Sequence, residues 1–241
     1  MGPGSARRPS PNPDWAVSTA EMEFAEMSKP AQDPALLASL SRHRLVPVVV
    51  IDDVRSAAPL GDALVAGGLP VAEVTFRTDA GVEALRRLAA RGDLLVGAGT
   101  VLTPAQVDEA VRAGAAFVVS PGLSRGVVER CLEHGVLPLP GAVTAAEIQA
   151  ALELGLTTVK FFPAESSGGA AAVKALSAPF TGVRFMPTGG IGPANLGEYL
   201  ALPAVRAVGG SWMVPQDRIG DTGAVTALVR GAVQLAASLR P

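Results

Sequence analysis

The sequence has little cysteine and little histidine, and each scarcity excludes a class of site. Cys131 is the only cysteine among 241 residues, so the chain cannot form an internal disulfide or supply a cluster of thiolate metal ligands. The two histidines, His43 and His134, are too few for most histidine-based metal sites, and neither has a second ligand at the required spacing. We therefore expect neither a bound metal nor another cofactor.

The chain also has no large excess of positive or negative charge, and it has no long apolar run. Lysine and arginine total 20 against 22 acidic residues, and the formal net charge of −2 argues against binding nucleic acid or a membrane surface by bulk electrostatics. Glycine, proline or a charged residue interrupts every apolar run before it reaches membrane-spanning length. Arg7 and Arg8 precede no apolar stretch, so no secretory signal is expected. These features predict a cytoplasmic protein with no nucleic-acid or membrane partner.

Apolar material is abundant, and it is unevenly distributed along the chain. Hydrophobic residues make up 49% of the sequence and aromatic residues only 4%, so Val, Leu, Ile and Ala must build most of the core. The beginning of the chain differs, because Met1–Pro13 is rich in Pro, Gly and Ser and Glu21–Glu26 is acidic. We predict a flexible N-terminal extension over residues 1–34 and a single domain over residues 35–241.

The apolar, β-branched runs predict eight parallel strands. Most of the runs are continuously apolar rather than alternating, as in parallel strands that helices cover on the outside. They begin near Leu45, Pro70, Leu94, Ala116, Leu137, Thr157, Val183 and Val205. Segments with helical spacing lie between them, including Ala58–Ala66, Gly81–Ala90, Ala105–Ala113, Gly126–His134 and Ala145–Leu154.

Helix-capping signals agree with this pattern. Thr103 precedes Pro104, which is an N-cap followed by proline at the first helical position, and Thr144 with Glu147 matches a capping box. Eight strand starts at intervals of 20 to 26 residues fit a compact (β/α)₈ barrel, the TIM barrel. A doubly wound open sheet is the alternative, but such a sheet usually carries a glycine-rich loop after its first strand, and residues 50–55 contain no glycine.

Lys160 stands out because it lies inside the apolar run Thr158–Pro163 of the sixth predicted strand and is one of only three lysines. Burial among apolar groups favours the neutral amine, which is the form that attacks a ketone to give a Schiff base. An arginine could not replace it, because a guanidinium stays protonated. The alternative is a structural lysine that pairs with a carboxylate inside the barrel or lies exposed at a strand edge.

The second predicted strand carries further charge. Glu73, Thr75 and Arg77 share one face by the two-residue period of a strand, and charged groups inside a barrel are costly unless they pair or act. One interpretation is an internal ion-pair network, in which Glu73 also pairs with Lys160. The other is a proton-transferring carboxylate beside a guanidinium that binds a substrate carboxylate.

Three glycine-containing segments follow other predicted strands, at the end of a barrel where reactive groups lie. Gly97–Thr100 ends the third strand and offers a hydroxyl. Pro187–Ile191 and Gly209–Trp212 follow the seventh and eighth strands, and each contains a pair of glycines. Because barrels often bind phosphate through backbone amides after these two strands, the pairs predict a phosphate site.

Six short motifs occur in the order and spacing of one known family. They are Glu73-Val-Thr-Phe-Arg-Thr78, Gly97-Ala-Gly-Thr-Val101, Ser120-Pro-Gly122, Val159-Lys-Phe-Phe-Pro-Ala-Glu165, Pro187-Thr-Gly-Gly-Ile191 and Gly209-Gly-Ser-Trp212. From about Leu45 to Gly210 the chain resembles the bacterial 2-keto-3-deoxy-6-phosphogluconate (KDPG) aldolases, which often also act on 4-hydroxy-2-oxoglutarate (KHG).

The resemblance implies a metal-independent class I aldolase that forms a homotrimer and acts on a phosphorylated 2-keto-3-deoxy sugar acid. It places Lys160 at the Schiff-base lysine and Glu73 at the proton-transferring carboxylate. It also assigns the substrate carboxylate to Arg77 and Thr100, the pocket wall to Pro121 and Phe162, and the phosphate to Thr188, Gly189, Gly190, Gly210 and Ser211.

The implied reaction is cleavage of KDPG to pyruvate and glyceraldehyde 3-phosphate, with cleavage of KHG to pyruvate and glyoxylate as a second activity. Phe162 and Ser211 favour the gluconate-type substrate over the galactonate-type one, although the motifs separate these two poorly. Two other interpretations remain: an isomerase or decarboxylase in which Lys160 acts electrostatically, and a non-catalytic barrel that binds sugar phosphates. The presence of both Lys160 and Glu73 argues against the non-catalytic barrel.

Overall fold

The computed structural model describes Met1 and residues 31–239. The chain divides into two compact units, Met1–Pro30 and Ala31–Pro241, and all the helices and strands given below belong to the second. The predicted flexible extension over residues 1–34 falls mainly on residues 2–30, which lie outside the described residues, so that part stays a prediction. Its last four residues were wrongly included, because Gln32 is buried and a helix begins at Pro34.

Eight parallel strands lie in the described part of the chain, and each begins within three residues of its predicted start. They are β1 (Leu45–Val49), β2 (Val71–Thr75), β3 (Leu95–Gly99), β4 (Phe117–Val119), β5 (Leu137–Leu139), β6 (Thr158–Phe161), β7 (Arg184–Pro187) and β8 (Val208–Gly210). Six of them form one sheet in the order β5-β4-β3-β2-β1-β8, and β6 pairs with β7. Isolated parallel bridges join Gly141 to Lys160 and Thr188 to Gly209.

The strand order distinguishes the two predicted architectures. A doubly wound sheet reverses its order at a switch point, whereas this sheet runs through consecutive strands and then brings β8 beside β1. The doubly wound alternative is therefore wrong. The fold is α/β, with a parallel sheet that curls into a half-barrel.

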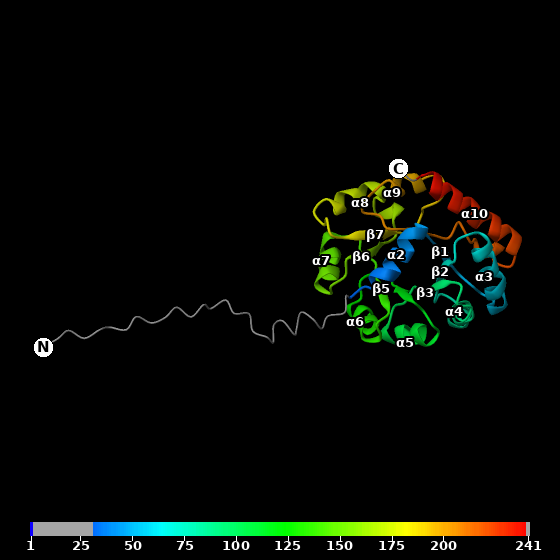
Figure 1. The fold of residues 1–241 in the computed structure, drawn as a ribbon, viewed down its shortest axis with the longest axis horizontal. Helices are drawn as coiled ribbons and strands as arrows, with labels where there is room; N and C mark the ends of the chain where they lie inside the picture. The colour runs from blue at the N-terminus through cyan, green and yellow to red at the C-terminus, as the bar shows by residue number, and fades with distance from the viewer. Residues whose placement is uncertain (2–30, 240–241) are drawn as a thin grey trace. The chain divides into compact units, whose positions relative to one another are not determined.

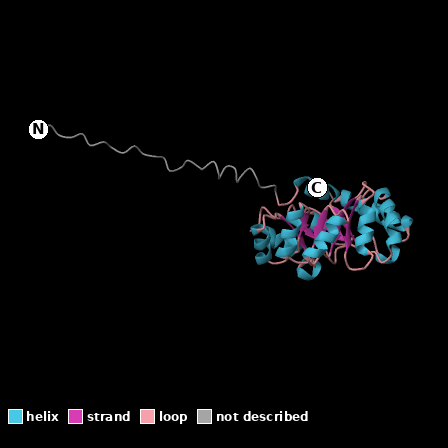
Figure 2. Ribbon diagram, turned by 90° about the horizontal axis from the view of Figure 1, so that it is seen from below, coloured by secondary structure: helices cyan, strands magenta, loops and turns pink. Residues whose placement is uncertain are grey.

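The first helix lies over the centre of the strands in the view of Figure 1, and the other helices surround the strands in chain order; Figure 2 shows the strands enclosed between helices. They are α2 (Pro34–His43), α3 (Ala57–Ala66), α4 (Gly81–Ala89), α5 (Pro104–Arg112), α6 (Arg125–His134), α7 (Ala145–Glu153), α8 (Gly169–Ser177), α9 (Leu196–Leu200) and α10 (Thr222–Ser238). The predicted capping box of Thr144 and Glu147 is confirmed at the start of α7. No helix within residues 31–239 combines the length and apolar character needed to cross a membrane.

Alternation along β6 decides which way its lysine faces. Phe161 is fully buried and packs edge to face against Phe185 of β7, with 6.4 Å between the ring centroids. Neighbouring residues of a strand point to opposite faces. Lys160 therefore points away from this aromatic pair, which places its side chain on the inner face of the curled sheet.

Gln32 links two strands that share no regular ladder, β5 and β6. Its amide nitrogen donates to the carbonyl oxygens of Pro138 and Thr158, both at 2.8 Å. Its amide oxygen accepts from the backbone N–H groups of Thr157 at 2.9 Å and Thr158 at 2.8 Å. With only 5% of its surface exposed, Gln32 satisfies backbone groups that the interrupted sheet leaves without strand partners.

Candidate active site

The side chains of Lys160 and Glu73 meet inside the curled sheet. Their positions come from β6 and β2, 87 residues apart in the sequence, and Lys160 Nζ lies 3.1 Å from Glu73 Oε1. Lys160 is 4% exposed and Glu73 is fully buried. The predicted pairing is confirmed, so the lysine is neither on a strand edge nor exposed to water.

Gly99 of β3 has no side chain, and this leaves room for Glu73. A Cβ at Gly99 would lie 2.5 Å from Glu73 Oε1 and 2.6 Å from its Cγ, which is far closer than van der Waals contact. The second carboxylate oxygen, Oε2, is buried and has no hydrogen-bond partner among the described residues. Glu73 thus holds Lys160 with one oxygen and keeps the other available as an acceptor.

Arg77 and Thr100 lie together at the ends of β2 and β3. Arg77 Nε donates to Thr100 Oγ1 at 3.2 Å. Arg77 follows the end of β2 at Thr75, so it belongs to the turn and not to the strand as predicted. Thr100 adopts a left-handed conformation with φ of 58°, which is unusual for a residue other than glycine and is common at functional turns.

A cavity of about 240 Å³ opens at the carboxyl ends of the strands. Seven predicted site residues line it, namely Arg77, Phe162, Thr188, Gly189, Gly190, Gly210 and Ser211. Three residues that sequence reasoning missed also line it, namely Val48, Val50 and Ile191. The alternating positions of Val48 and Val50 at the end of the first predicted strand were the signal that could have found two of them.

The two glycine-pair loops form one side of this cavity. Gly189 and Gly190 have φ of 104° and 76°, values that favour glycine, so their backbone can turn where other residues would be strained. At Gly210 a Cβ would lie 1.7 Å from the ring of Trp212, so only glycine fits beneath the indole. The predicted loops therefore lie side by side at the mouth, where backbone amides can bind an anion.

Glu165 and Tyr199 support the first loop, and sequence reasoning assigned no role to either. The backbone N–H of Glu165 donates to the carbonyl of Gly189 at 3.1 Å, and the Glu165 side chain fills the space where a Gly190 Cβ would lie. The hydroxyl of buried Tyr199 donates to Glu165 Oε1. Burial and this carboxylate raise the pKa of Tyr199 well above its usual value, so the phenol remains a donor.

Pro121 lies apart from the cavity-lining residues. It follows β4, and its carbonyl oxygen would be 2.0 Å from a Cβ at Gly141, the residue that bridges to Lys160. Pro121 therefore approaches the lysine through the backbone of Gly141. Its predicted contact with substrate stays a prediction.

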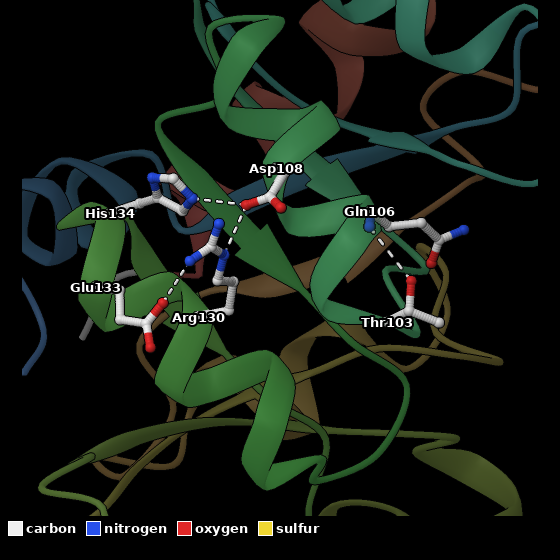
Figure 3. Close-up of polar contacts among 6 residues, drawn as sticks. All are labelled: Thr103, Gln106, Asp108, Arg130, Glu133 and His134. Carbon is white, nitrogen blue, oxygen red and sulfur yellow. Dashed lines mark hydrogen bonds and ion pairs between the residues drawn. The ribbon is translucent and has the colours of Figure 1, made fainter.

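Cys131 and the histidines lie outside the cavity. Burial raises the pKa of the Cys131 thiol to about 12, which agrees with its predicted role as a small buried side chain. Figure 3 shows His134 and Arg130 of α6 directed at Asp108 of α5. Arg130 Nε and His134 Nε2 each lie 2.7 Å from Asp108 Oδ1. Hydrogen bonds from these two groups lower the pKa of Asp108 to about 2. This cluster joins two outer helices.

Comparisons with known proteins agree on one family. The family model "Aldolase: KDPG and KHG aldolase" matches residues 37–228. A 2-dehydro-3-deoxy-phosphogluconate aldolase from Treponema pallidum is 52% identical over 200 residues, which cover 82% of this chain and 95% of the relative.

Solved structures give the same result. The KDPG aldolase of Zymomonas mobilis with 3-phosphoglycerate superposes with a TM-score of 0.79 at 41% identity, covering 85% of this chain and 96% of that one. The KDPG aldolase of Legionella pneumophila, with pyruvate captured as a covalent carbinolamine, has a TM-score of 0.78 at 40% identity and covers 85% and 98%.

Proposed function

The chain belongs to the KDPG and KHG aldolase family, and we propose that it cleaves KDPG to pyruvate and glyceraldehyde 3-phosphate with Lys160 as the Schiff-base amine. It is a class I aldolase. The observation that supports the residue assignment is the buried contact of 3.1 Å between Lys160 Nζ and Glu73 Oε1 beside a cavity lined by glycine loops. Cleavage of KHG to pyruvate and glyoxylate uses the same pyruvyl half and is proposed as a second activity.

The first step is formation of the imine. Glu73 accepts a proton from the Lys160 ammonium across the 3.1 Å contact and leaves a neutral amine. The amine adds to the C2 ketone of the substrate to give a carbinolamine. Glu73 then returns its proton to the carbinolamine hydroxyl, which leaves as water, so that a cationic imine forms and Glu73 is ionised again. A carbinolamine with pyruvate is the intermediate captured in the Legionella pneumophila relative.

The second step breaks the C3–C4 bond. The imine accepts the electron pair of that bond and becomes an enamine, while a carboxylate oxygen of Glu73 takes the proton of the C4 hydroxyl, directly or through a water. The C4 hydroxyl oxygen becomes the aldehyde oxygen of the departing glyceraldehyde 3-phosphate. Glu73 then returns the proton to C3, and hydrolysis of the imine releases pyruvate and the Lys160 amine.

The remaining site residues position the substrate. Arg77 and Thr100, already joined at 3.2 Å, bind the carboxylate next to the reacting ketone. Phe162 and Pro121 form the apolar wall, and the ring of Phe162 lies 4.9 Å from Lys160 Nζ. Thr188 and the amides of Gly189, Gly190, Gly210 and Ser211 bind the phosphate, so that binding energy from the far end of the substrate helps to align the scissile bond.

Three broader proposals accompany the reaction: a complete barrel, a cytoplasmic location and a trimer. The eight strands close a complete (β/α)₈ barrel, which is supported by the bridges from Gly141 to Lys160 and from Thr188 to Gly209 between the two sheets. The protein acts as a cytoplasmic homotrimer, which rests on the family resemblance. Sedimentation equilibrium tests the trimer, for which we expect three times the chain mass of 24.4 kDa.

Borohydride trapping tests the nucleophile. Incubation with pyruvate and reduction should give a stable adduct on Lys160 by peptide mass spectrometry. Lys160→Arg keeps the charge but cannot form the imine, so trapping should be lost, whereas Lys174→Arg on α8 is the matched control and should trap normally. An adduct on another lysine, or none in the folded protein, contradicts the assignment.

Two further measurements separate the remaining roles. Glu73→Gln should still trap pyruvate, although more slowly because the Lys160 ammonium loses its proton acceptor, and turnover should slow by roughly 10²–10⁴-fold, the usual contribution of a proton-transferring group. Comparison of kcat/KM for the gluconate- and galactonate-derived phosphates decides the stereochemistry, and we expect the gluconate compound to be preferred. Equal values would remove the gluconate assignment while leaving the class I mechanism intact.

A further inference from the structure

Three arginines gather at the end of the strands opposite the proposed active site. Arg184 is the first residue of β7, Arg206 lies two residues before β8, and Arg44 immediately precedes β1. Because β8 pairs with β1 and Phe185 bridges to Val205, the beginnings of these three strands are neighbours.

A cavity of about 290 Å³ lies among these arginines. We call it the arginine pocket, and it is lined by Ser41, Arg44, Arg184, Pro203, Val205 and Arg206. Among the residues that the structure describes, the lining contains three guanidinium groups and no carboxylate. Its volume is close to the lower limit of about 300 Å³ for small-molecule sites.

Hydrogen bonds help to hold the three arginines in place. Arg206 Nη1 donates to Ser41 Oγ at 3.0 Å, and Arg184 Nη1 donates to the carbonyls of Thr181 and Val183. Arg44 donates through its two Nη atoms to the carbonyls of Ala236 and Leu200, at 2.8 and 3.1 Å. Fixed guanidinium groups of this kind are preorganised for a ligand, since little side-chain entropy remains to be lost.

Arg206 carries the clearest sign of a missing partner. Its Nε–H is buried and has no hydrogen-bond partner among residues 31–239. Within the same residues, neither Arg206 nor Arg184 has a carboxylate within ion-pair distance, whereas Arg91 and Arg130 each have two. Burial and the charge of Arg184 lower the pKa of Arg206. Like charges held together in this way are stabilised when an anion is shared between them.

We propose that the arginine pocket is a second anion site, which binds a small phosphate-type oxyanion between Arg184 and Arg206. Guanidinium groups recognise the oxygens of phosphate through paired N–H donors, and the unpartnered Nε–H of Arg206 supplies one of them. Inorganic phosphate and a phosphate monoester share this chemistry. The site lies at the end of the strands away from Lys160, so the anion plays no part in the aldol cleavage itself.

Calorimetric titration with inorganic phosphate at fixed ionic strength tests the proposal. The background variant is Ser211→Asp, whose carboxylate repels phosphate from the glycine loops, and it should still bind one phosphate per chain. Adding Arg206→Gln should weaken that binding at least tenfold, and adding Arg206→Lys should restore part of it. The matched control is Arg42→Gln, which removes the same charge from an exposed position on α2 outside the pocket and should leave affinity unchanged.

The outcomes are distinct. Absence of phosphate binding in the Ser211→Asp protein, or equal weakening by Arg206→Gln and Arg42→Gln, overturns the proposal. Unchanged aldol cleavage by Arg206→Gln in the otherwise native chain shows that the variant is folded. A parallel titration with glycerol 3-phosphate identifies the source: binding of both compounds supports a phosphate monoester, and binding of inorganic phosphate alone supports the free anion.

Discussion

Gly99→Ala should disable the proposed active site by displacing one carboxylate. The new Cβ would lie 2.5 Å from Glu73 Oε1 and 2.6 Å from Cγ, whereas non-bonded heavy atoms prefer about 3.5 Å or more, so the Glu73 side chain must move by about 1 Å. Gly99 itself has an ordinary backbone conformation that alanine can adopt, since its φ is not in the left-handed region. The substitution therefore acts through Glu73.

The magnitude follows from the contact that is lost. A shift of this size breaks the 3.1 Å hydrogen bond to Lys160, and a misplacement of about 1 Å costs roughly 10²-fold in rate. Overpacking a core position costs about 1–3 kcal/mol of stability, so the domain should stay folded at room temperature. We expect kcat for KDPG cleavage to fall by about 10²-fold, measured through coupled reduction of the pyruvate product.

Two controls make the reasoning refutable. Gly182→Ala adds the same methyl group where no heavy atom lies within 4 Å, and it should keep full activity. In a Glu73→Gln background, Gly99→Ala should cause little further loss, because the two changes act on the same group. A Gly99→Ala protein with turnover within threefold of the native enzyme would show that the position of Glu73 does not control the rate.

Other parts of the fold give further tests. Tyr199→Phe removes the hydrogen bond that fixes Glu165 under the first glycine loop, so KM for KDPG should rise severalfold while KM for the phosphate-free KHG stays within twofold. Gln32→Leu leaves buried carbonyls and amides without partners and should lower the free energy of unfolding by about 2–4 kcal/mol in urea titrations. Asp108→Asn should lower stability at pH 6 but not at pH 2. The pKa of Asp108 is about 2 in the folded protein against 3.8 ordinarily, so its contribution is complete above about pH 4 and is lost as pH falls through 2.

Each of these tests has its own comparison. For Tyr199→Phe, an equal rise in KM for KDPG and in KM for KHG would show that Tyr199 supports the stability of the fold and does not act through the first glycine loop. For Gln32, the matched variant is Gln149→Leu on the exposed face of α7, which should change the unfolding free energy by less than about 0.5 kcal/mol. For Asp108, a stability difference from the asparagine variant that persists at pH 2 contradicts the proposed ionised partner of Arg130.

Local signals in the sequence were sufficient for the elements and for most of the cavity. Strand starts and the cap at Thr144 depend on neighbouring residues, so they could be predicted closely. Gln32 could not, because its partners lie 106 and 126 residues away and only the folded chain brings them together. The same holds for Tyr199, whose role depends on a carboxylate 34 residues earlier in the chain.

The contact between Lys160 and Glu73 is better explained by chemistry than by stability. A buried ion pair costs desolvation that its attraction often fails to recover, and apolar residues of similar size are commonly at least as stable. A pair kept for structure would also have its remaining acceptors satisfied, yet Glu73 Oε2 is buried without a partner among residues 31–239. Glu73 is fully buried, and its partner Lys160 lies 4.9 Å from the ring of Phe162, a residue that lines the cavity. A free acceptor beside an amine next to a cavity is what proton transfer to and from a bound substrate requires. The unsatisfied oxygen, more than the ion pair, therefore favours a catalytic role over a structural one.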